Sequence, residues 1–459
     1  MYYKSIKIKG YRGFVNQEKL NLAQPNGENG SGLTIVVGPN NSGKSTIYES
    51  FRAIAQNQEP SFTEGKRNKK AGDQIGIILE DFDGNTIQLK TSAGGGSETE
   101  FVENGIKKKE LKIFTLPSRR TFNPFFHKGT WNRDTYIGQS NLPSIRGKEL
   151  ENFNHRIFSL QKNQKEFNAI LEKVITNMPE WYIDQNDIGN YYIKFNYNGS
   201  YHNSDGVGEG IISVFTIVDT LYDSEPGDTI IIDEPELSLH PSLQRRMSRL
   251  IEEYSKDRQI VISTHSPFFI NWESIINGAE LSRTVKHEDI TSINYLTRES
   301  VDEIKTLLKN FNNPHILGIN ANEVFFLDDN IILVEGQEDV IFFKRIQELM
   351  NIQSNIPFFG WGAGGASNMD KILGVLKDLG FKKVSVIFDN NVGEIKTQIE
   401  DKFPDYNIEV IPTDDVRDKS EIKAKPEIKG LIDRGGKTIV EEHKESIQKM
   451  FENIEKYHK

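Results

Sequence analysis

Residues 38–45 read GPNNSGKS, and their types and spacing are those of a loop that holds phosphate groups. Gly38 and Gly43 leave room for backbone N–H groups to curl around phosphate oxygens. Lys44 adds a positive charge, and the hydroxyl of Ser45 is a ligand for Mg²⁺. The segment therefore predicts a nucleotide site. The residues expected to bind the nucleotide here are Gly38, Asn40, Asn41, Ser42, Gly43, Lys44, Ser45 and Thr46.

Two acidic residues stand at the end of an apolar run farther along the chain, in the segment TIIIDEPE at 229–236. Asp233 stands where it can hold the water shell of Mg²⁺ with Ser45, and Glu234 where it can orient or activate an attacking water. An apolar strand that ends in two acids is weakly specific alone. Together with residues 38–45 it becomes a strong signal, and the pair predicts hydrolysis of the bound nucleotide.

Buried strands have to bring these two segments together. Residues 33–37 form a short β-branched run directly before the glycine-rich turn, and a helix is expected after the turn, within 38–55. The runs 228–233 and 258–263 are almost wholly apolar and bracket a helix at 241–255. Such runs are typical of strands that are buried on both faces of a parallel sheet.

After a weakly patterned stretch at 285–325, short apolar runs alternate with helical periodicity, which predicts a second, smaller βαβ domain. Glu335 and Asp389 each follow one of its strands. Because parallel strands end side by side, both carboxylates are expected to face one crevice, with oxygen ligands that suit Mg²⁺. The expected strands are 331–334, 356–359, 383–388 and 407–411, separated by helices at 338–350, 367–379 and 394–402.

The composition excludes several classes of protein. The chain has 459 residues, a net charge of -10 and no cysteine. The charge argues against a protein that coats nucleic acid by charge alone, and the lack of cysteine leaves carboxylates, hydroxyls or His as metal ligands. No apolar run approaches the ~18 residues of a membrane span. The N-terminal run MYYKSIKIKG has no secretion signal, so we expect a cytoplasmic protein without membrane contact.

The order of these motifs resembles the ABC-type ATPases of the SMC and OLD (overcoming lysogenisation defect) group. The segments that carry the resemblance are GPNNSGKST, SDG, IIIDEPELSLHP and ISTHSP. It implies ATP as the nucleotide, Glu234 as the catalytic base and His265 as the histidine that contacts the γ-phosphate. It also implies that Ser204, Asp205 and Gly206 bind ATP held by an opposite subunit, although the family usually has Gly at the second position. Hydrolysis would then require at least a homodimer.

Two further segments resemble the same group. Residues 237–241, which read LSLHP, match its D-loop. Arg119 and Arg120 stand where similar proteins carry a basic pair near the nucleotide or a substrate surface. A solvated surface pair is the other interpretation.

The second domain resembles the Toprim domain that follows the ATPase in OLD-family nucleases. There, a Glu after the first strand and an Asp-x-Asp after a later strand hold metal for phosphodiester cleavage. Glu335 and Asp389 match this pattern, but Asn391 replaces the second Asp, and a neutral amide is a weaker ligand. An active nuclease and a degenerate fold kept for assembly or partner binding both stay open. The nearby acids that would compensate are Glu338, Asp339, Asp414 and Asp415.

These observations predict an α/β protein of two domains. Residues 1–315 are expected to form an ABC-type P-loop ATPase domain with a helical insertion at about 145–200. Residues 325–459 are expected to form a smaller Toprim-like (Rossmann-like) domain with a charged helical tail.

The resemblance extends to the ATPase components of PARIS-, Septu- and retron-associated anti-phage systems. It implies an ATP-hydrolysing sensor or scaffold of a homo-oligomeric defence complex. A separate nuclease or toxin protein would be the effector, and DNA or a phage protein the trigger. One alternative is a single-chain, ATP-regulated and metal-dependent DNA endonuclease of the OLD type. The other is a nucleotide-locked clamp that binds DNA ends without cutting them.

Overall fold

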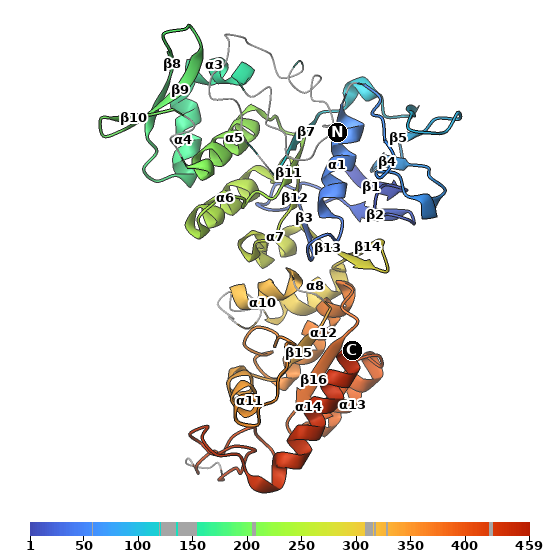
Figure 1. Cartoon of the computed structure of the whole chain (residues 1–459), viewed down its shortest axis with the longest axis vertical. Helices are drawn as coiled ribbons and strands as arrows, with labels where there is room; N and C mark the ends of the chain where they lie inside the picture. The colour runs from blue at the N-terminus through green and yellow to red at the C-terminus, as the bar shows by residue number, and fades with distance from the viewer. Residues whose placement is uncertain are drawn as a thin grey trace. The chain divides into compact units, whose positions relative to one another are not determined.

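The chain divides into two compact units, Met1–Tyr295 and Leu296–Lys459 (Figure 1). This division precedes the stretch at 315–325 because α8 (Arg298–Lys305) packs on α12 (Met369–Asp378) of the second unit. Each unit has a hydrophobic core of its own. The computed structural model describes residues 1–56, 58–118, 120, 135, 154–203, 208–307, 315, 318–326, 329–421 and 426–459.

The central sheet of the first unit runs in the order β14-β13-β3-β12-β11-β7. Its strands pair in parallel, except that β14 lies antiparallel on β13. Every residue of β3, β11 and β12 is buried, as their β-branched sequences predict. The strands are β3 (Leu33–Val37), β7 (Ile113–Leu116), β11 (Thr229–Asp233), β12 (Gln259–Ser263), β13 (Glu280–His287) and β14 (Ile290–Tyr295).

An antiparallel sheet in the order β2-β1-β4-β5-β6 forms a second layer. Helix α1 (Lys44–Ala55) lies between the two sheets and contacts β5 on one side and β7, β11 and β12 on the other (Figure 1). Its buried side chains join the core that both sheets share. The strands are β1 (Tyr3–Lys9), β2 (Glu18–Asn21), β4 (Gly76–Asp81), β5 (Thr86–Thr91) and β6 (Thr99–Asn104).

Helices cover the face of the central sheet that lies opposite α1, and Figure 1 shows α5 and α6 there. Helix α4 packs on both α5 and α6. The unit also contains the short helix α7 (Trp272–Asn277), between β12 and β13. The other helices of this layer are α3 (Asn154–Lys162), α4 (Gln164–Val174), α5 (Glu209–Asp223) and α6 (Pro241–Tyr254).

The region expected to be a helical insertion is helical only as far as residue 174. Beyond it, β8 (Glu180–Gln185), β9 (Tyr191–Tyr197) and β10 (Ser200–His202) form an antiparallel sheet in the order β10-β9-β8. The reason is a period-two pattern that buries Trp181 and Phe195 against helix α5, where Phe215 lies 5.0 Å from the Trp181 ring.

The second unit is an α/β unit with a parallel sheet in the order β15-β16-β17. Residues 356–359, expected as a strand, contribute only a bridge between Phe358 and Ile332. The C-terminal helix, which forms the end of the charged tail, begins at Lys444. The elements after α8 are α10 (Ile319–Glu323), β15 (Ile331–Leu333), α11 (Gln337–Leu349), α12, β16 (Val384–Phe388), α13 (Gly393–Lys402), β17 (Asn407–Val410) and α14 (Lys444–His458).

Among the helices that the structure describes, none has the length and apolar character that crossing a membrane requires.

Candidate functional site

The glycine-rich loop joins β3 to α1 and owes its shape to residues with left-handed backbone. Gly38 has φ +136°, Asn41 φ +61° and Gly43 φ +114°. A Cβ atom at position 38 would lie 2.3 Å from the carbonyl oxygen of Thr284, so the close approach of β13 requires glycine there. The loop thus delivers the N-terminus of α1, with its free N–H groups, to the end of the sheet.

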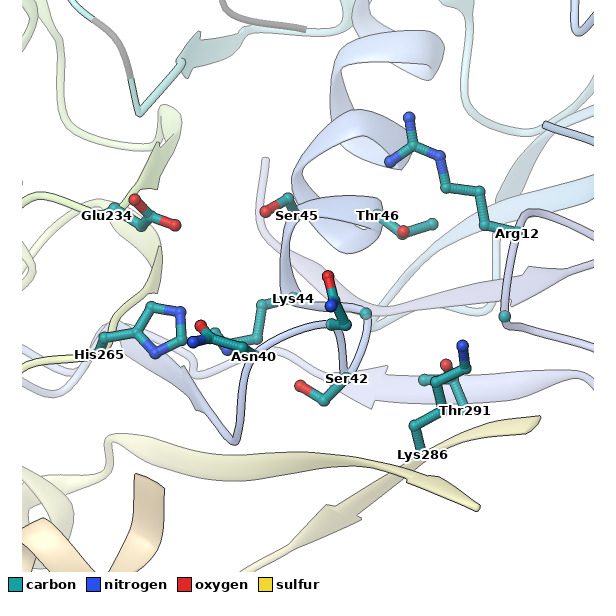
Figure 2. Close-up of a pocket in the computed structure, with 13 residues that line it drawn as sticks. Arg12, Asn40, Ser42, Lys44, Ser45, Thr46, Glu234, His265, Lys286 and Thr291 are labelled. Atoms are coloured by element: carbon teal, nitrogen blue, oxygen red, sulfur yellow. The ribbon is translucent and has the colours of Figure 1, made fainter. Parts of the chain in front are cut away.

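A cavity of about 580 Å³ opens over this loop. Figure 2 shows Glu234 and His265 on one side of the loop residues, and Arg12 and Thr291 on the other. The strand order explains the meeting, because β3, β12 and β11 are neighbours whose carboxyl ends carry the loop, His265 and Glu234 in turn. The lining residues are Arg12, Gly13, Asn40, Asn41, Ser42, Gly43, Lys44, Ser45, Thr46, Glu234, His265, Lys286 and Thr291.

Lys44 is the buried cation of the cavity. Its Nζ donates hydrogen bonds to the carbonyl oxygens of Gly38 at 2.7 Å and Pro39 at 2.9 Å. Burial lowers the pKa of Lys44 to about 8, although the carboxylates of Glu234 and Asp233 oppose this shift. A buried ammonium with few partners is a strong point charge for phosphate oxygens.

The acidic pair at the end of β11 divides between two environments. Asp233 is buried and outside the cavity lining, and its carboxylate accepts a hydrogen bond from the Ser263 hydroxyl. Glu234 turns away into the cavity because its backbone is left-handed, with φ +49°. Its N–H donates to the carbonyl oxygen of Ser263 at 2.7 Å, which holds this turn against β12.

His265 follows β12 and lines the same cavity as Glu234. Burial, with a smaller contribution from the Lys44 charge, lowers the pKa of His265 to about 4. The imidazole is therefore neutral at physiological pH and has one donor and one acceptor nitrogen. Such a ring suits a hydrogen bond to a terminal phosphate.

Four lining residues escaped the sequence analysis: Arg12, Gly13, Lys286 and Thr291. The signal that the sequence offers for Arg12 is the pair of glycines in the segment GYRGF, which is typical of a tight turn. In the structure, Arg12 has a left-handed backbone there (φ +49°). Its guanidinium pairs with Glu49 at 2.8 Å. Lys286 and Thr291 come from the β13–β14 hairpin, and nothing in their local sequence marks them.

The predicted residues Ser204, Asp205 and Gly206 lie outside the described residues, as does Arg119. Arg120 is buried rather than solvated, so the solvated interpretation is wrong for this residue. Its Nη atoms donate to the carbonyl oxygens of Asp233 at 2.9 Å and Glu234 at 2.8 Å, behind the cavity.

The second unit brings carboxylates together at the ends of β15 and β16. The N–H of Asp389 donates to the Glu335 carboxylate at 3.2 Å. Burial, reinforced by Asp339 and Glu335, raises the pKa of Asp389 to about 8, and burial raises that of Asp339 to about 6. The fourth acid of this cluster is Asp415, which is paired with Lys419.

Other acids predicted for this site lie elsewhere. Asp414 is exposed, and its backbone carbonyl accepts a hydrogen bond from Asn391 at 3.2 Å. Glu338 is paired with Arg417. Across the part of the chain that the structure describes, no group of three or more His, Cys, Asp or Glu side chains is arranged to hold a metal ion.

Two protein-family models match the first unit. Residues 1–198 match the family described as "AAA ATPase domain". Residues 139–271 match the family described as "AAA domain, putative AbiEii toxin, Type IV TA system". Between them, the two matched ranges contain the glycine-rich loop, the acidic pair and His265.

Known proteins resemble parts of this chain. An OLD nuclease of Thermus scotoductus is 32% identical over 183 residues, which cover 38% of this chain and 33% of the nuclease. This chain therefore spans about a third of that protein's length. The Septu protein PtuA of Bacillus thuringiensis is 24% identical over 301 residues, which cover 59% of this chain and 74% of PtuA.

A solved SMC head, bound to the C-winged helix domain of ScpA, aligns with 66% of this chain and all of its own, with a TM-score of 0.44 and 13% identity. The two family models mark the first unit as ATPase sequence, and the similarity to the OLD nuclease supports an ATPase of the OLD/ABC type. The Toprim-like character of the second unit stays a prediction.

Proposed function

We propose that this chain, an ATPase of the OLD/ABC type, binds ATP with Mg²⁺ and hydrolyses it as the sensor or scaffold of an anti-phage defence complex. The observation that carries the proposal is the shared cavity. It gathers a phosphate-binding loop, a buried lysine, a carboxylate and a neutral histidine from the ends of three adjacent strands.

The residues fit the chemistry of ATP hydrolysis. Ser45 and Asp233 are the groups that would hold Mg²⁺, which neutralises charge on the phosphates. Lys44 and the loop N–H groups bind the phosphate oxygens. Glu234 orients and activates the attacking water, and His265 donates or accepts a hydrogen bond at the terminal phosphate.

The finer parts of the proposal concern assembly. A homodimer or a higher homo-oligomer would form through ATP, with Ser204, Asp205 and Gly206 of one subunit completing the site of another. A separate nuclease or toxin is the effector, and DNA or a phage protein is the trigger. The similarity to PtuA over 59% of the chain supports this assignment.

An ATPase assay with two variants tests the proposal. Lys44→Ala is expected to abolish ATP binding, because the buried charge is lost. Glu234→Gln is expected to bind ATP, to reduce turnover on the order of 100-fold and to accumulate as an ATP-bound oligomer. Lys173→Ala, which removes an exposed ion pair, is the matched control. If Glu234→Gln hydrolyses ATP at the wild-type rate, Glu234 is not the base.

A second candidate function is metal-dependent cleavage of DNA in the second unit. The raised pKa values of Glu335, Asp339 and Asp389 favour it, since buried carboxylates near one another lose repulsion when a divalent cation binds, and such a cation would have to draw together acids that the described structure does not group as a metal site. A plasmid-nicking assay with Mg²⁺ or Mn²⁺ decides between the candidates. Cutting by the wild type that is lost in Glu335→Ala supports the nuclease, and no cutting under either metal removes it.

A further inference from the structure

A third acid follows the catalytic pair in the same turn. Glu236 does not line the cavity, and its carboxylate is directed to the loop that carries His265. One oxygen accepts a hydrogen bond from the backbone N–H of His265 at 2.5 Å, and the other accepts one from the Thr264 hydroxyl at 2.8 Å. Glu236 thus spans the two residues that leave β12.

Helix α6 holds this loop at its other end. Gln244, in the first turn of α6, donates through Nε2 to the carbonyl oxygen of Leu239 at 2.8 Å. Its Oε1 accepts a hydrogen bond from the Ser266 hydroxyl at 2.6 Å. Residues 264–266 are therefore held by two side chains, Glu236 of the β11–α6 connection at Thr264 and His265, and Gln244 of α6 at Ser266.

These contacts matter because His265 has no regular structure to hold it. Its ring reaches the cavity from a loop, and its backbone direction decides where the imidazole lies. Without the Glu236 carboxylate, a half-buried N–H and a buried hydroxyl lose the acceptor that they share. The loop would then rearrange, and a displacement of about 1 Å at a catalytic group is enough to reduce turnover 100-fold.

We propose that Glu236 is a positioning residue for ATP hydrolysis, which acts through the backbone of His265 and not through the nucleotide. The inference rests on the proposed ATPase function. It differs from the assignments already made because Glu234 and His265 face the cavity, whereas Glu236 faces the loop behind it.

Steady-state kinetics of Glu236→Ala and Glu236→Gln test this role. Glu236→Ala is expected to lower kcat by 10- to 100-fold while KM for ATP changes less than about 3-fold, because the phosphate loop is untouched. Glu236→Gln is expected to keep most of kcat, since its amide oxygen still accepts from His265 and its NH₂ group donates to Thr264. Glu253→Ala, an exposed acid on α6, is the control.

A double-variant cycle separates positioning from general damage. If Glu236 acts through His265, then Glu236→Ala adds no further loss of kcat in a His265→Ala background. Additive losses, or a Glu236→Gln variant as defective as Glu236→Ala, would overturn the proposal. Wild-type kcat in Glu236→Ala would overturn it as well.

A readout that needs no turnover distinguishes failure of this inference from failure of the proposed function. The imidazole of His265 is assigned by NMR from the signal lost in His265→Ala, and its pKa is measured in full-length protein. In Glu236→Ala this pKa is expected to rise from about 4 toward 6.5 as the ring leaves its buried position. An unchanged pKa contradicts positioning by Glu236. A wild type without ATPase activity contradicts only the proposed function.

Discussion

At the scale of single residues, the candidate nucleotide site depends on backbone conformations that most residue types rarely adopt. Gly38 and Gly43 are left-handed in the phosphate loop, and Glu234 is left-handed at the strand end. A left-handed backbone is strained at a residue other than glycine. At Glu234, a hydrogen bond from Arg120 to its carbonyl oxygen and one from its N–H to Ser263 hold this backbone in place. This backbone conformation directs the Glu234 side chain into the cavity, whereas the side chain of Asp233, one residue earlier, stays buried.

Replacing Gly38 with alanine is expected to destroy the phosphate loop. The added Cβ would lie 2.3 Å from the Thr284 carbonyl oxygen, and φ +136° disfavours any side chain. We expect loss of ATP binding in a fluorescent-nucleotide titration, with a cost of roughly 1–3 kcal/mol in stability. Gly27→Ala is the matched control, because Gly27 has φ +96° but nothing within 4 Å of its Cβ position. Equal binding by both variants would contradict the steric argument.

Glu236 also predicts a pH dependence. Burial raises the pKa of Glu236 from 4.5 to about 7. The folded chain therefore holds this proton more tightly than the unfolded chain, so the contribution of Glu236 to stability falls as pH rises from about 4.5 to 7. Glutamine does not titrate, so the Tm of Glu236→Gln minus that of the wild type should increase by about 3 °C across this window. Calorimetry at pH 5 and 7.5 measures it, and a constant difference would refute the assignment.

At the scale of elements, the parallel strands position the residues of the candidate site, and the helices pack around those strands. The ends of β3, β12 and β11 lie in one row, so each following loop faces the same cavity. Helices α3 and α5, which precede and follow the small β8–β10 sheet, are joined by a buried ion pair. Arg156 on α3 lies 3.3 Å from Asp219 and 2.6 Å from Asp223 on α5.

Breaking this ion pair is expected to loosen the helical layer. Arg156→Ala leaves Asp219 buried without its charge partner, at a cost of about 3–5 kcal/mol. Lys173→Ala removes an ion pair of 2.6 Å to Glu253 whose side chains are 47% and 42% exposed, and should cost less than about 1 kcal/mol. Urea unfolding of both variants measures the contrast, and equal midpoints would mean that the buried pair adds no stability.

At the scale of the whole molecule, two units with separate cores share one chain. Nucleotide chemistry belongs to the first unit and the carboxylate cluster to the second. Units with their own cores are able to unfold separately.

Calorimetry of the full chain should therefore show two transitions. ATP with Mg²⁺, added to Glu234→Gln at 100 times its Kd, stabilises the folded site by about 2.7 kcal/mol and should raise one transition. Leu431→Ala, in the core of the second unit, should lower the other. A single transition that responds to both changes would show that the units unfold together.

Much of the fold followed from local pattern. The strands β3, β11 and β12 and helix α6 lie within a residue or two of their predicted bounds, because buried apolar runs and capping residues are local signals. The prediction of a helical insertion at about 145–200 does not include the β8–β10 sheet, because the helical periodicity that supports it ends before these strands and Phe195 follows a period of two. Residues 356–359 were predicted as a strand but form only the bridge at Phe358, because a short apolar run does not show how many neighbouring residues it pairs with.

The sequence by itself determined which residues are candidates for nucleotide chemistry, since glycines, Lys44, Ser45 and the Asp233–Glu234 pair have types and spacings that hardly any other function requires. Only the tertiary structure decided which distant residues join them. In the tertiary structure, Arg12 and Lys286 line the cavity and Arg120 is buried. Asp415, and not Asp414, lies near Asp389. The physical reason is that spacing along the chain reports local geometry, whereas convergence depends on strand order and on the pairing of segments hundreds of residues apart.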